Sequence, residues 1–337
     1  MLLESFLFQF DGKIPKSCFA FGLTATPMKH VLVTGGAGFI GTNVAKYAIK
    51  SGIRVTIIDW ATLPLEKLIE FNELGINYLQ YDIRDLDKLN TINGEFDSII
   101  HLAAQVSVPK SFSRQKETEE INIQGTKNVI SLGKKLGVKR FILASSSAVY
   151  GDCGVMPLTE NSTGTLLSPY AETKYVNEMI IKDEFDNGNE FLALRFFNVY
   201  GPGQNANSQY AAVIPKFLQL VKEKKPITIY GDGKQSRDFV HVSEVSRLLI
   251  SLSVEKWLSP TQHVFNIGTG QSHTISQLVE MIIDFSDENT NFEIQYGEER
   301  SGDIRHSIAS IDSTKEQLGW EPSIAFEEGL KRLIQGS

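Results

Sequence analysis

Residues 29–41 read KHVLVTGGAGFIG, and this stretch decides the fold. Its first six residues predict a short buried strand, and the residues from Thr42 to about Lys50 predict a helix after the glycine loop. Glycines at 36, 38 and 41 satisfy G-x-G-x-x-G, while those at 35, 38 and 41 satisfy G-x-x-G-x-x-G. A pyrophosphate can approach the N–H groups of a helix start only where no Cβ intervenes. Strand, loop and helix together predict a dinucleotide-binding unit.

An acidic residue follows at the distance that such a unit requires. The predicted strand from Arg54 to Ile58 ends in Asp59, eighteen residues past Gly41. A carboxylate there accepts hydrogen bonds from the adenosine ribose hydroxyls and repels a 2′-phosphate. The sequence therefore favours NAD over NADP as the cofactor.

Strands and helices then alternate along the chain. Further strands are predicted at residues 76–81, 97–102, 139–144 and 190–196, and helical periodicity separates them, as between Glu119 and Leu136. This alternation predicts an α/β fold with a Rossmann-type, doubly wound parallel sheet. Ligands then bind at the carboxyl ends of the strands.

The composition changes after residue 197. A polar, turn-rich stretch is followed by a predicted helix from Val213 to about Lys222 and a predicted strand from His263 to Ile267. We expect a smaller C-terminal substrate-binding lobe, interleaved with the first unit. The expected division is an N-terminal extension (1–28), an NAD-binding Rossmann domain (29–197 plus about 236–264) and the lobe (198–235 and 265–337).

Charge and cysteine content limit the partners and the compartment. The net charge of −7 argues against nucleic acid or a membrane surface as the main partner. Cys18 and Cys153 lack the spacing of a metal or redox site, so we expect free thiols and a reducing, cytoplasmic compartment. The apolar segment 2–10 lacks the basic residues that precede a signal-peptide core.

A candidate proton acceptor lies in residues 167–174, which read LSPYAETK. Ser168 suits a helix N-cap and Pro169 suits the first turn, so a helix is predicted to start here. Tyr170 and Lys174 then share one helix face. An ammonium about 4 Å away supplies the roughly 4 kcal/mol needed to bring a phenol pKa from about 10 to near 7. The spacing therefore predicts Tyr170 as a general base.

Together these motifs resemble the extended short-chain dehydrogenase/reductase family, and within it the UDP-sugar 4-epimerases. The resemblance covers about residues 29–335. It rests on the glycine loop, Asp59, the Tyr170/Lys174 pair and seven further motifs: Asp82-Ile83, HLAA at 101–104, SSSAVYG at 145–151, RFFNVYGP at 195–202, GDG at 231–233, RDF at 237–239 and RSGD at 300–303.

The resemblance implies a role for each matched residue. Ser146 would hydrogen-bond the sugar 4-oxygen, Tyr170 would take and return its proton, and Lys174 would hold the nicotinamide ribose while lowering the tyrosine pKa. The implied NAD contacts are Gly35, Gly38, Phe39, Ile40, Gly41, Asp59, Asp82, Ile83, Leu102, Ala103, Ala104, Gln105, Asn122, Ser145, Tyr170, Lys174 and Phe197. The implied substrate contacts are Ser107, Ser146, Ser147, Tyr170, Asn198, Ala212, Val213, Arg237, Arg300, Asp303 and Ser307. No metal site is expected.

The activity that the resemblance implies is C4 epimerisation of a UDP-hexose. Tyr170 would deprotonate the 4-hydroxyl as hydride leaves C4 for NAD⁺. The 4-keto sugar would then turn about its diphosphate, and hydride would return to the opposite face. A homodimer is implied as well, through the helix near residues 112–136 and the helix that begins at Tyr170.

Two positions narrow the substrate. Dehydratases of this superfamily carry an Asp-Glu pair after the catalytic hydroxyl, and decarboxylases commonly keep the Glu, but here those places hold Ser147 and Ala148. At the place of Ser307 a small side chain admits an N-acetyl group on the sugar. We favour UDP-N-acetylglucosamine and UDP-N-acetylgalactosamine as substrates, with UDP-glucose and UDP-galactose also possible.

Three alternatives stay open. The first is a UDP-glucose 4-epimerase without preference for N-acetyl sugars. The second is a UDP-uronate epimerase or decarboxylase, for which Arg305 is the nearby candidate cation. The third is a non-catalytic dinucleotide-binding protein, in which Ser146, Tyr170 and Lys174 would have no chemical purpose.

Overall fold

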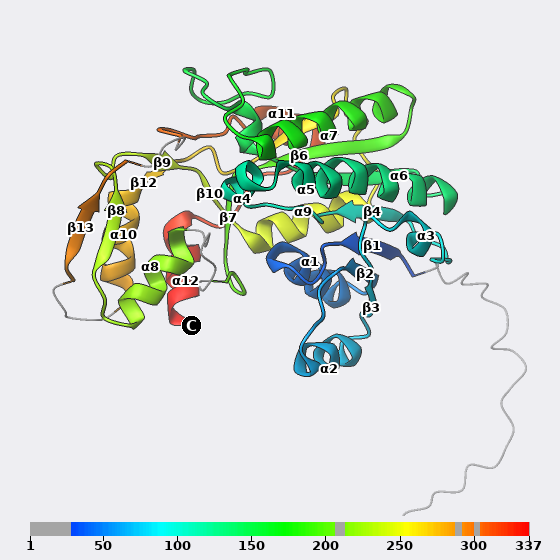
Figure 1. The fold of residues 1–337 in the computed structure, drawn as a ribbon, viewed down its shortest axis with the longest axis horizontal. Helices are drawn as coiled ribbons and strands as arrows, with labels where there is room; N and C mark the ends of the chain where they lie inside the picture. The colour runs from blue at the N-terminus through cyan, green and yellow to red at the C-terminus, as the bar shows by residue number, and fades with distance from the viewer. Residues whose placement is uncertain (1–27, 206–212, 287–291, 300–303, 337) are drawn as a thin grey trace, which may run out of the picture.

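A seven-stranded parallel sheet forms the centre of the protein (Figure 1). The structure is a computed structural model that describes residues 28–205, 213–286, 292–299 and 304–336. The strand order is β3-β2-β1-β4-β5-β6-β11, which is the Rossmann order 3-2-1-4-5-6 extended by one strand. The strands are β1 (His30–Thr34), β2 (Arg54–Asp59), β3 (Asn77–Gln80), β4 (Ser98–His101), β5 (Arg140–Ser146), β6 (Glu190–Phe196) and β11 (Val264–Ile267). The predicted fold class is confirmed.

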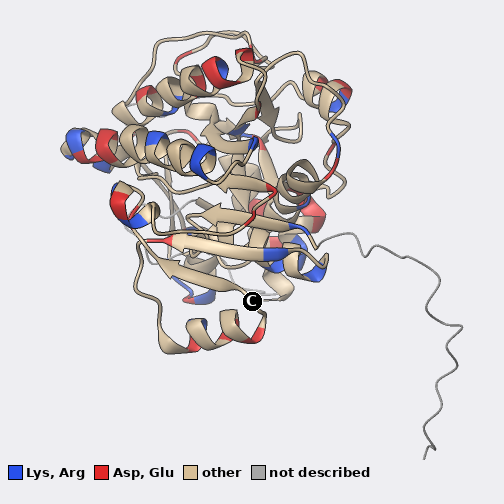
Figure 2. Cartoon of the chain, turned by 90° about the vertical axis from the view of Figure 1, so that its right-hand side faces the viewer, with Lys and Arg blue, Asp and Glu red and all other residues tan. Residues whose placement is uncertain are grey.

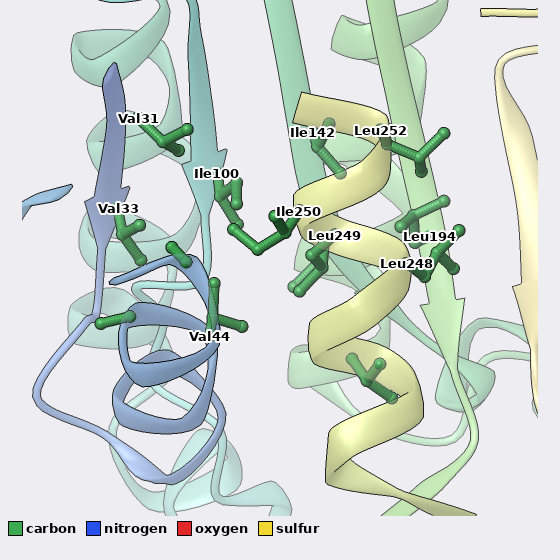
Figure 3. Packing of buried hydrophobic residues seen from close by; sticks show 14 of the residues in the cluster. Val31, Val33, Val44, Ile100, Ile142, Leu194, Leu248, Leu249, Ile250 and Leu252 are labelled. Atoms are coloured by element: carbon green, nitrogen blue, oxygen red, sulfur yellow. The ribbon is translucent and has the colours of Figure 1, made fainter. Parts of the chain in front are cut away.

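Helices cover both faces of this sheet, so successive side chains of a strand enter two different cores. Val31 and Val33 of β1 pack in the core below α1 (Phe39–Lys50) and α9 (Val242–Val254). Figure 3 shows these valines next to Ile100 of β4, in the same core as Leu249 and Ile250 of α9. Leu32 points into the opposite core, with Val129 of α6 (Gly125–Lys135). Because both faces are buried, the strands read as continuous apolar runs.

The remaining helices of this unit join the strands in sequence. They are α2 (Leu65–Glu73), α3 (Leu86–Leu89), α4 (Val108–Ser113), α5 (Gln115–Glu119), a π-helical turn η2 (Glu120–Gln124), the 3₁₀ turn η3 (Ser147–Tyr150) and α7 (Pro169–Asp186). The helix predicted over 119–136 is therefore α6 together with the preceding π turn. The helix predicted from Thr42 begins three residues earlier, at Phe39.

The chain returns to the sheet after its first excursion into the lobe. Helix α9 packs against α1, and β11 pairs with β6 in parallel register. Residues 265–267 of β11 therefore lie in the central sheet, three residues beyond the boundary expected near 264. Helix α11 (Asp312–Leu318) also contacts β11.

The smaller lobe has its own apolar core. Its parallel strands β8 (Ile227–Tyr230) and β13 (Ile294–Gly297) pair with each other, and α8 (Val213–Lys222), α10 (Ile275–Phe285) and α12 (Phe326–Gln335) lie beside them (Figure 1). Ile214, Leu278 and Leu330 are among its buried residues. Two short pairs connect lobe and sheet: β7 (Asn198–Tyr200) with β10 (Phe239–His241), and β9 (Ser236–Arg237) with β12 (His273–Thr274).

Charged side chains of both signs are interspersed on the outer helices in the view of Figure 2. Within the described residues, the helices are all too short or too polar to cross a membrane.

Candidate active site

The glycine loop is closed tightly between β1, β4 and α1. Gly35 has φ +69°, and a Cβ there would lie 2.7 Å from the backbone nitrogen of Ala103. A Cβ on Gly41 would lie 2.4 Å from the carbonyl oxygen of Gly35. Helix α1 begins directly after Gly38, with Phe39 and Ile40 in its first turn. These contacts leave room only for glycine and place the helix start at the carboxyl edge of the sheet, where a pyrophosphate would bind.

Asp59 lies next to this loop at the end of β2. Its carboxylate accepts hydrogen bonds from the N–H groups of Ala37, at 3.0 Å, and Ala61, at 3.1 Å. The side chain is thus held beside the loop in an almost completely buried position. This is the geometry expected for an acid that binds the adenosine ribose.

Asp82 and Ile83 follow β3 at the same edge of the sheet. The Arg84 guanidinium hydrogen-bonds the Asp82 carboxylate, with Nη2–Oδ2 at 2.6 Å, and holds its pKa below the usual range. Ile83 is buried against Gly125, where a Cβ would meet its Cδ1 at 2.5 Å. Both residues are therefore fixed in place on the adenine side of the predicted cofactor site.

Asn122 holds the segment after β4, which is predicted to line the nicotinamide path. Its Oδ1 accepts the N–H of Gln105 at 2.7 Å, and its Nδ2 donates to the carbonyl of Gln105 at 3.1 Å. Nδ2 also donates to Oγ1 of Thr173 on α7, at 3.0 Å. The π turn η2 carries Asn122, and such turns are frequent at functional sites. Asn122 therefore ties the Ala103–Gln105 segment to the helix that carries Tyr170.

Ser107 has a local structural role in addition to its predicted contact with substrate. Its hydroxyl accepts the N–H of Lys110 at 3.3 Å and caps α4. Gln105 packs against it and donates from Nε2 to the Ser107 carbonyl at 3.1 Å. The segment is thus held by hydrogen bonds within itself.

Ser146, Tyr170 and Lys174 come together as predicted. Ser168 caps α7 by accepting the N–H of Ala171 at 3.2 Å, which confirms the predicted helix start. Tyr170 and Lys174 are buried on one face of α7, and Ser146, which ends β5, lies near the Tyr170 side chain. Ser146 also accepts the N–H of Ala148 at 3.2 Å. The three side chains thus lie at the carboxyl edge of the sheet, where β5 ends and α7 begins.

The pKa of Tyr170 has other causes in this structure than the one predicted. The Lys174 ammonium donates to the carbonyl of Ala144 at 2.7 Å and lies 5.9 Å from the centre of the Tyr170 ring. Burial raises the pKa of Tyr170, and the neighbouring side chain of Ser146 opposes that rise. Spacing along a helix shows that two side chains share a face, but it does not show how deeply they are buried or where the ammonium donates.

A buried ion pair that the sequence reasoning missed lies one turn beyond Lys174. Glu178 is fully buried and accepts two hydrogen bonds from Arg195 of β6, with Nε–Oε1 at 2.9 Å and Nη2–Oε2 at 2.8 Å. The hydroxyl of Ser145 also donates to Glu178. Ser145, predicted as a cofactor contact, thus turns its side chain toward α7. The sequence held one signal of this ion pair: Glu178 lies four residues after Lys174, on the helix face that carries the site.

Three residues predicted to contact the substrate lie in the lobe or in the short strand pairs that connect it to the sheet. Asn198 begins β7, and its N–H donates to the carbonyl of Asp238 at 2.9 Å. Arg237 ends β9 and donates from Nη1 to the carbonyl of Ser236 at 2.8 Å. Ser307 is buried, and its N–H donates to the Ser236 carbonyl at 3.1 Å.

Other predicted residues take simpler positions. Val213 begins α8, Phe197 is buried, and Ser147, Leu102 and Ala104 are half-buried near the ends of β5 and β4. Three predicted substrate contacts, Ala212, Arg300 and Asp303, lie outside the described residues, as does most of the N-terminal extension.

Comparison with known proteins agrees with this geometry. The family model described as "NAD dependent epimerase/dehydratase family" matches residues 31–268. The chain belongs to this family. NAD is therefore its cofactor, and the glycine loop, Asp59 and the clamped Gln105 segment fit that group. When bound, NAD supplies the hydride acceptor that this enzyme uses.

Three relatives illustrate the similarity. The structure of a UDP-N-acetylglucosamine 4-epimerase from Methanobrevibacter ruminantium, in complex with UDP-N-acetylmuramic acid, is 36% identical, with a TM-score of 0.83 over 91% of this chain and 97% of that one. A UDP-glucose 4-epimerase from Thermotoga maritima, with UDP-glucose, is 32% identical, with a TM-score of 0.81 over 91% and 97%. A UDP-glucuronate 4-epimerase from Thermodesulfobacterium geofontis is 32% identical over 92% of this chain and 96% of its own length. The enzyme is thus of the UDP-sugar epimerase type.

Proposed function

We propose that this enzyme interconverts the C4 epimers UDP-N-acetylglucosamine and UDP-N-acetylgalactosamine, and that it also accepts UDP-glucose and UDP-galactose. The small side chain of Ser307 is the observation that carries the preference for N-acetyl sugars. The similarity to the UDP-N-acetylglucosamine 4-epimerase of M. ruminantium supports the same assignment.

In the proposed reaction, residues at the end of β5 and at the start of α7 transfer the proton. Tyr170 takes the proton of the sugar 4-hydroxyl and later returns it, while Ser146 hydrogen-bonds the same oxygen. Lys174 is held by the carbonyl of Ala144 at 2.7 Å, one helical turn from Tyr170, where it can bind the nicotinamide ribose. Arg237 and the lobe grip the UDP part, so that binding energy from remote groups keeps the reacting sugar at the site.

The residues after the catalytic serine argue against elimination and decarboxylation. Ser147 and Ala148 form the 3₁₀ turn η3, where dehydratases carry an acidic pair. Neither side chain can serve as the acid or base that loss of water would need. The site therefore favours simple oxidation and re-reduction at C4.

A uronate substrate is less well supported. Arg305, the candidate partner for a C6 carboxylate, makes two hydrogen bonds with Asp232, with Nη1–Oδ1 at 2.8 Å and Nη2–Oδ2 at 2.6 Å. Because the guanidinium fork is already engaged by a carboxylate, it would have to leave that partner to bind a uronate. UDP-glucose without N-acetyl preference remains the stronger alternative.

We also propose that the protein is a homodimer. Phe112 of α4 is 61% exposed, and Tyr175, Val176 and Met179 of α7 are exposed as well. Large apolar side chains on neighbouring helices support an interface there. Sedimentation should give twice the mass of the 337-residue chain, and Phe112→Glu should return the monomer mass.

The test of the proposed activity uses purified enzyme without added reductant. UDP-N-acetylglucosamine, UDP-glucose and UDP-glucuronate are supplied separately, and the C4 epimers are resolved by NMR. A higher kcat/KM for the N-acetyl sugar supports the proposal. Conversion of UDP-glucose alone would contradict the proposed role of Ser307. Conversion of UDP-glucuronate alone would show that the substrate is a UDP-uronate and not a UDP-hexose.

A further inference from the structure

Asp238 is a fully buried carboxylate that joins three segments of the chain. Its Oδ1 accepts hydrogen bonds from the N–H and Oγ1 of Thr269, both at 2.7 Å. Its Oδ2 accepts from the N–H of Gly270, at 3.0 Å, and from the N–H of Ala309, at 3.2 Å. Four donors satisfy the charge without a cation among these contacts. The carboxylate therefore holds the 269–270 turn and the chain at Ala309 at fixed distances from each other.

Ala309 belongs to an extended segment, residues 305–310, that we call the gate strand because it carries Ser307. On one side, Ser236 donates to the carbonyl of Arg305 at 3.0 Å and accepts the N–H of Ser307 at 3.1 Å. On the other side, Leu158 donates to the carbonyl of Ile308 and accepts the N–H of Ser310, both at 2.8 Å. The gate strand thus lies between two other segments of the chain.

Those two segments both lead to the site. Ser236 directly precedes Arg237, the predicted diphosphate contact, in β9. Leu158 lies in the segment that follows Ser146 and η3, and its side chain is buried with Tyr150 and Ala309. The position of Ser307 is therefore defined relative to the diphosphate side and to the catalytic serine at once.

The carboxylate of Asp238 occupies the point where these constraints meet. It follows Arg237 in the chain, and its bond to Ala309 is made two residues after Ser307. The surrounding space is closed, because a Cβ on Gly268 would lie 2.7 Å from Oδ2 and 2.9 Å from the Cβ of Ala309. A displaced gate strand would have to break this bond or leave the carboxylate short of a donor.

We propose that Asp238 is a positioning residue for sugar specificity, which keeps Ser307 at the depth that admits the 2-substituent of the sugar. This proposal rests on the proposed function and deepens it. Asp238 does not touch substrate; it acts through the gate strand and through the adjoining Arg237. Substitution of Asp238 should therefore weaken the binding of the nucleotide sugar and reduce the selectivity between N-acetylated and plain sugars. The hydride and proton steps at Tyr170 should continue.

The first experiment compares Asp238→Asn with the wild-type holoenzyme. An amide nitrogen in place of one oxygen would face N–H donors, so at least one side of the carboxylate loses its bonds. The expected result is a KM for UDP-N-acetylglucosamine raised by about tenfold or more, with kcat within about threefold. The ratio of kcat/KM for UDP-N-acetylglucosamine to kcat/KM for UDP-glucose should fall toward about one. The content of bound NAD should stay at the wild-type level, because none of the hydrogen bonds of Asp238 is made with the glycine loop or Asp59.

Asp312→Asn is the matched control. Asp312 is an exposed carboxylate two residues beyond the gate strand, and it accepts a hydrogen bond from the Ser310 hydroxyl at 3.0 Å. Its loss should leave KM and the sugar ratio unchanged. An equal effect of both substitutions would overturn the proposal, since it would show a general response to lost charge.

Thr269→Val keeps the proposal falsifiable if Asp238→Asn does not fold. This change removes the Oγ1 donor at 2.7 Å, together with the two hydrogen bonds that Oγ1 makes with the backbone of Gln271 at 3.2 Å, and leaves the carboxylate in place. A smaller rise in KM with an altered sugar ratio supports the proposal. Unchanged KM and sugar ratio in the folded variant, or equal losses of kcat and NAD content with KM unchanged, would overturn it. Calorimetric binding of UDP separates this outcome from failure of the proposed activity, because UDP affinity is measured even if neither sugar is epimerised.

Discussion

Glu178 and Arg195 form a two-point ion pair between α7 and β6, with nitrogen–oxygen distances of 2.9 and 2.8 Å, and both side chains are buried. The guanidinium also donates to the carbonyl of Glu160 at 3.0 Å and lies 4.7 Å from the centre of the Tyr150 ring. The pair thus fixes the helix that carries Tyr170 and Lys174 to the strand beside β5. Removing one partner leaves the other as a buried charge without compensation.

We expect Glu178→Gln to lower the free energy of unfolding by about 3–5 kcal/mol, the usual cost of breaking a buried pair. The double variant Glu178→Gln/Arg195→Met should recover part of that loss, because no unpaired charge remains. Urea unfolding of both variants measures the difference. A double variant less stable than Glu178→Gln would contradict this account.

The sequence predicted the parts of the site that depend on short spacings. The glycine loop, Asp59 after β2 and the Ser168 cap of α7 all follow from local patterns, and the structure places each as expected. What it could not supply were contacts between distant segments. Nothing in the chain links Glu178 to Arg195 or Asp238 to Ala309 until the sheet brings them together.

The pKa of Tyr170 shows the same limit. The spacing to Lys174 is local and was predicted correctly, but burial depends on the whole fold. Burial raises the pKa of the phenol, and the ammonium donates to Ala144. Side-chain proximity along a helix is thus weaker evidence for a pKa than for a shared face.

Gly41→Ala should abolish tight NAD binding. A Cβ there would lie 2.4 Å from the Gly35 oxygen and 2.5 Å from the Gly36 Cα, and both are backbone atoms of the loop. We expect NAD affinity to fall about 30-fold or more, equivalent to about 2 kcal/mol. Gly154→Ala is the control, because a Cβ there meets no atom within 4 Å. Full NAD content in purified Gly41→Ala would show that the loop does not bind the pyrophosphate.

Activity should decline above pH about 8. Burial lowers the pKa of Lys174 to about 8, and the carboxylate of Glu178 opposes that shift. The cation that we propose to hold the nicotinamide ribose is lost above this pH, so kcat should fall there. Since the unfolded lysine has a pKa of about 10.4, the unfolded state binds more protons between pH 8 and 10.4, and this group adds stability as pH rises. Activity and stability should therefore change in opposite directions.

The measurement is kcat from pH 6.5 to 9.5, with urea unfolding at each pH. An arginine stays charged throughout this range. If Lys174→Arg retains activity, its alkaline decline should disappear. A decline near pH 8 that persists in Lys174→Arg would assign it to another group.

Tyr170→Phe should nearly abolish turnover while the ring packing is kept. The change removes the hydroxyl that we propose as the proton acceptor. Loss of a positioned acid or base lowers kcat by about 10²- to 10⁴-fold. Circular dichroism and NAD content should match the wild type, and Tyr175→Phe, at an exposed site on the same helix, should leave kcat unchanged. Turnover within about tenfold of wild type would exclude Tyr170 as the base.

Ser307→Tyr should separate the two classes of sugar. Ser307 is 4% exposed, so a tyrosine must occupy space next to the gate strand or displace that strand. If that space accepts the 2-N-acetyl group, the substitution should lower kcat/KM for UDP-N-acetylglucosamine by about 100-fold and leave UDP-glucose within about tenfold. The Ser307→Ala variant, in which the side chain at this position stays small, should convert both sugars as the wild type does. The two kcat/KM values are measured by NMR on NAD-loaded protein. Equal losses for both sugars would show that Ser307 does not contact the 2-substituent of the sugar. A UDP-glucose 4-epimerase without N-acetyl preference would then be the better assignment.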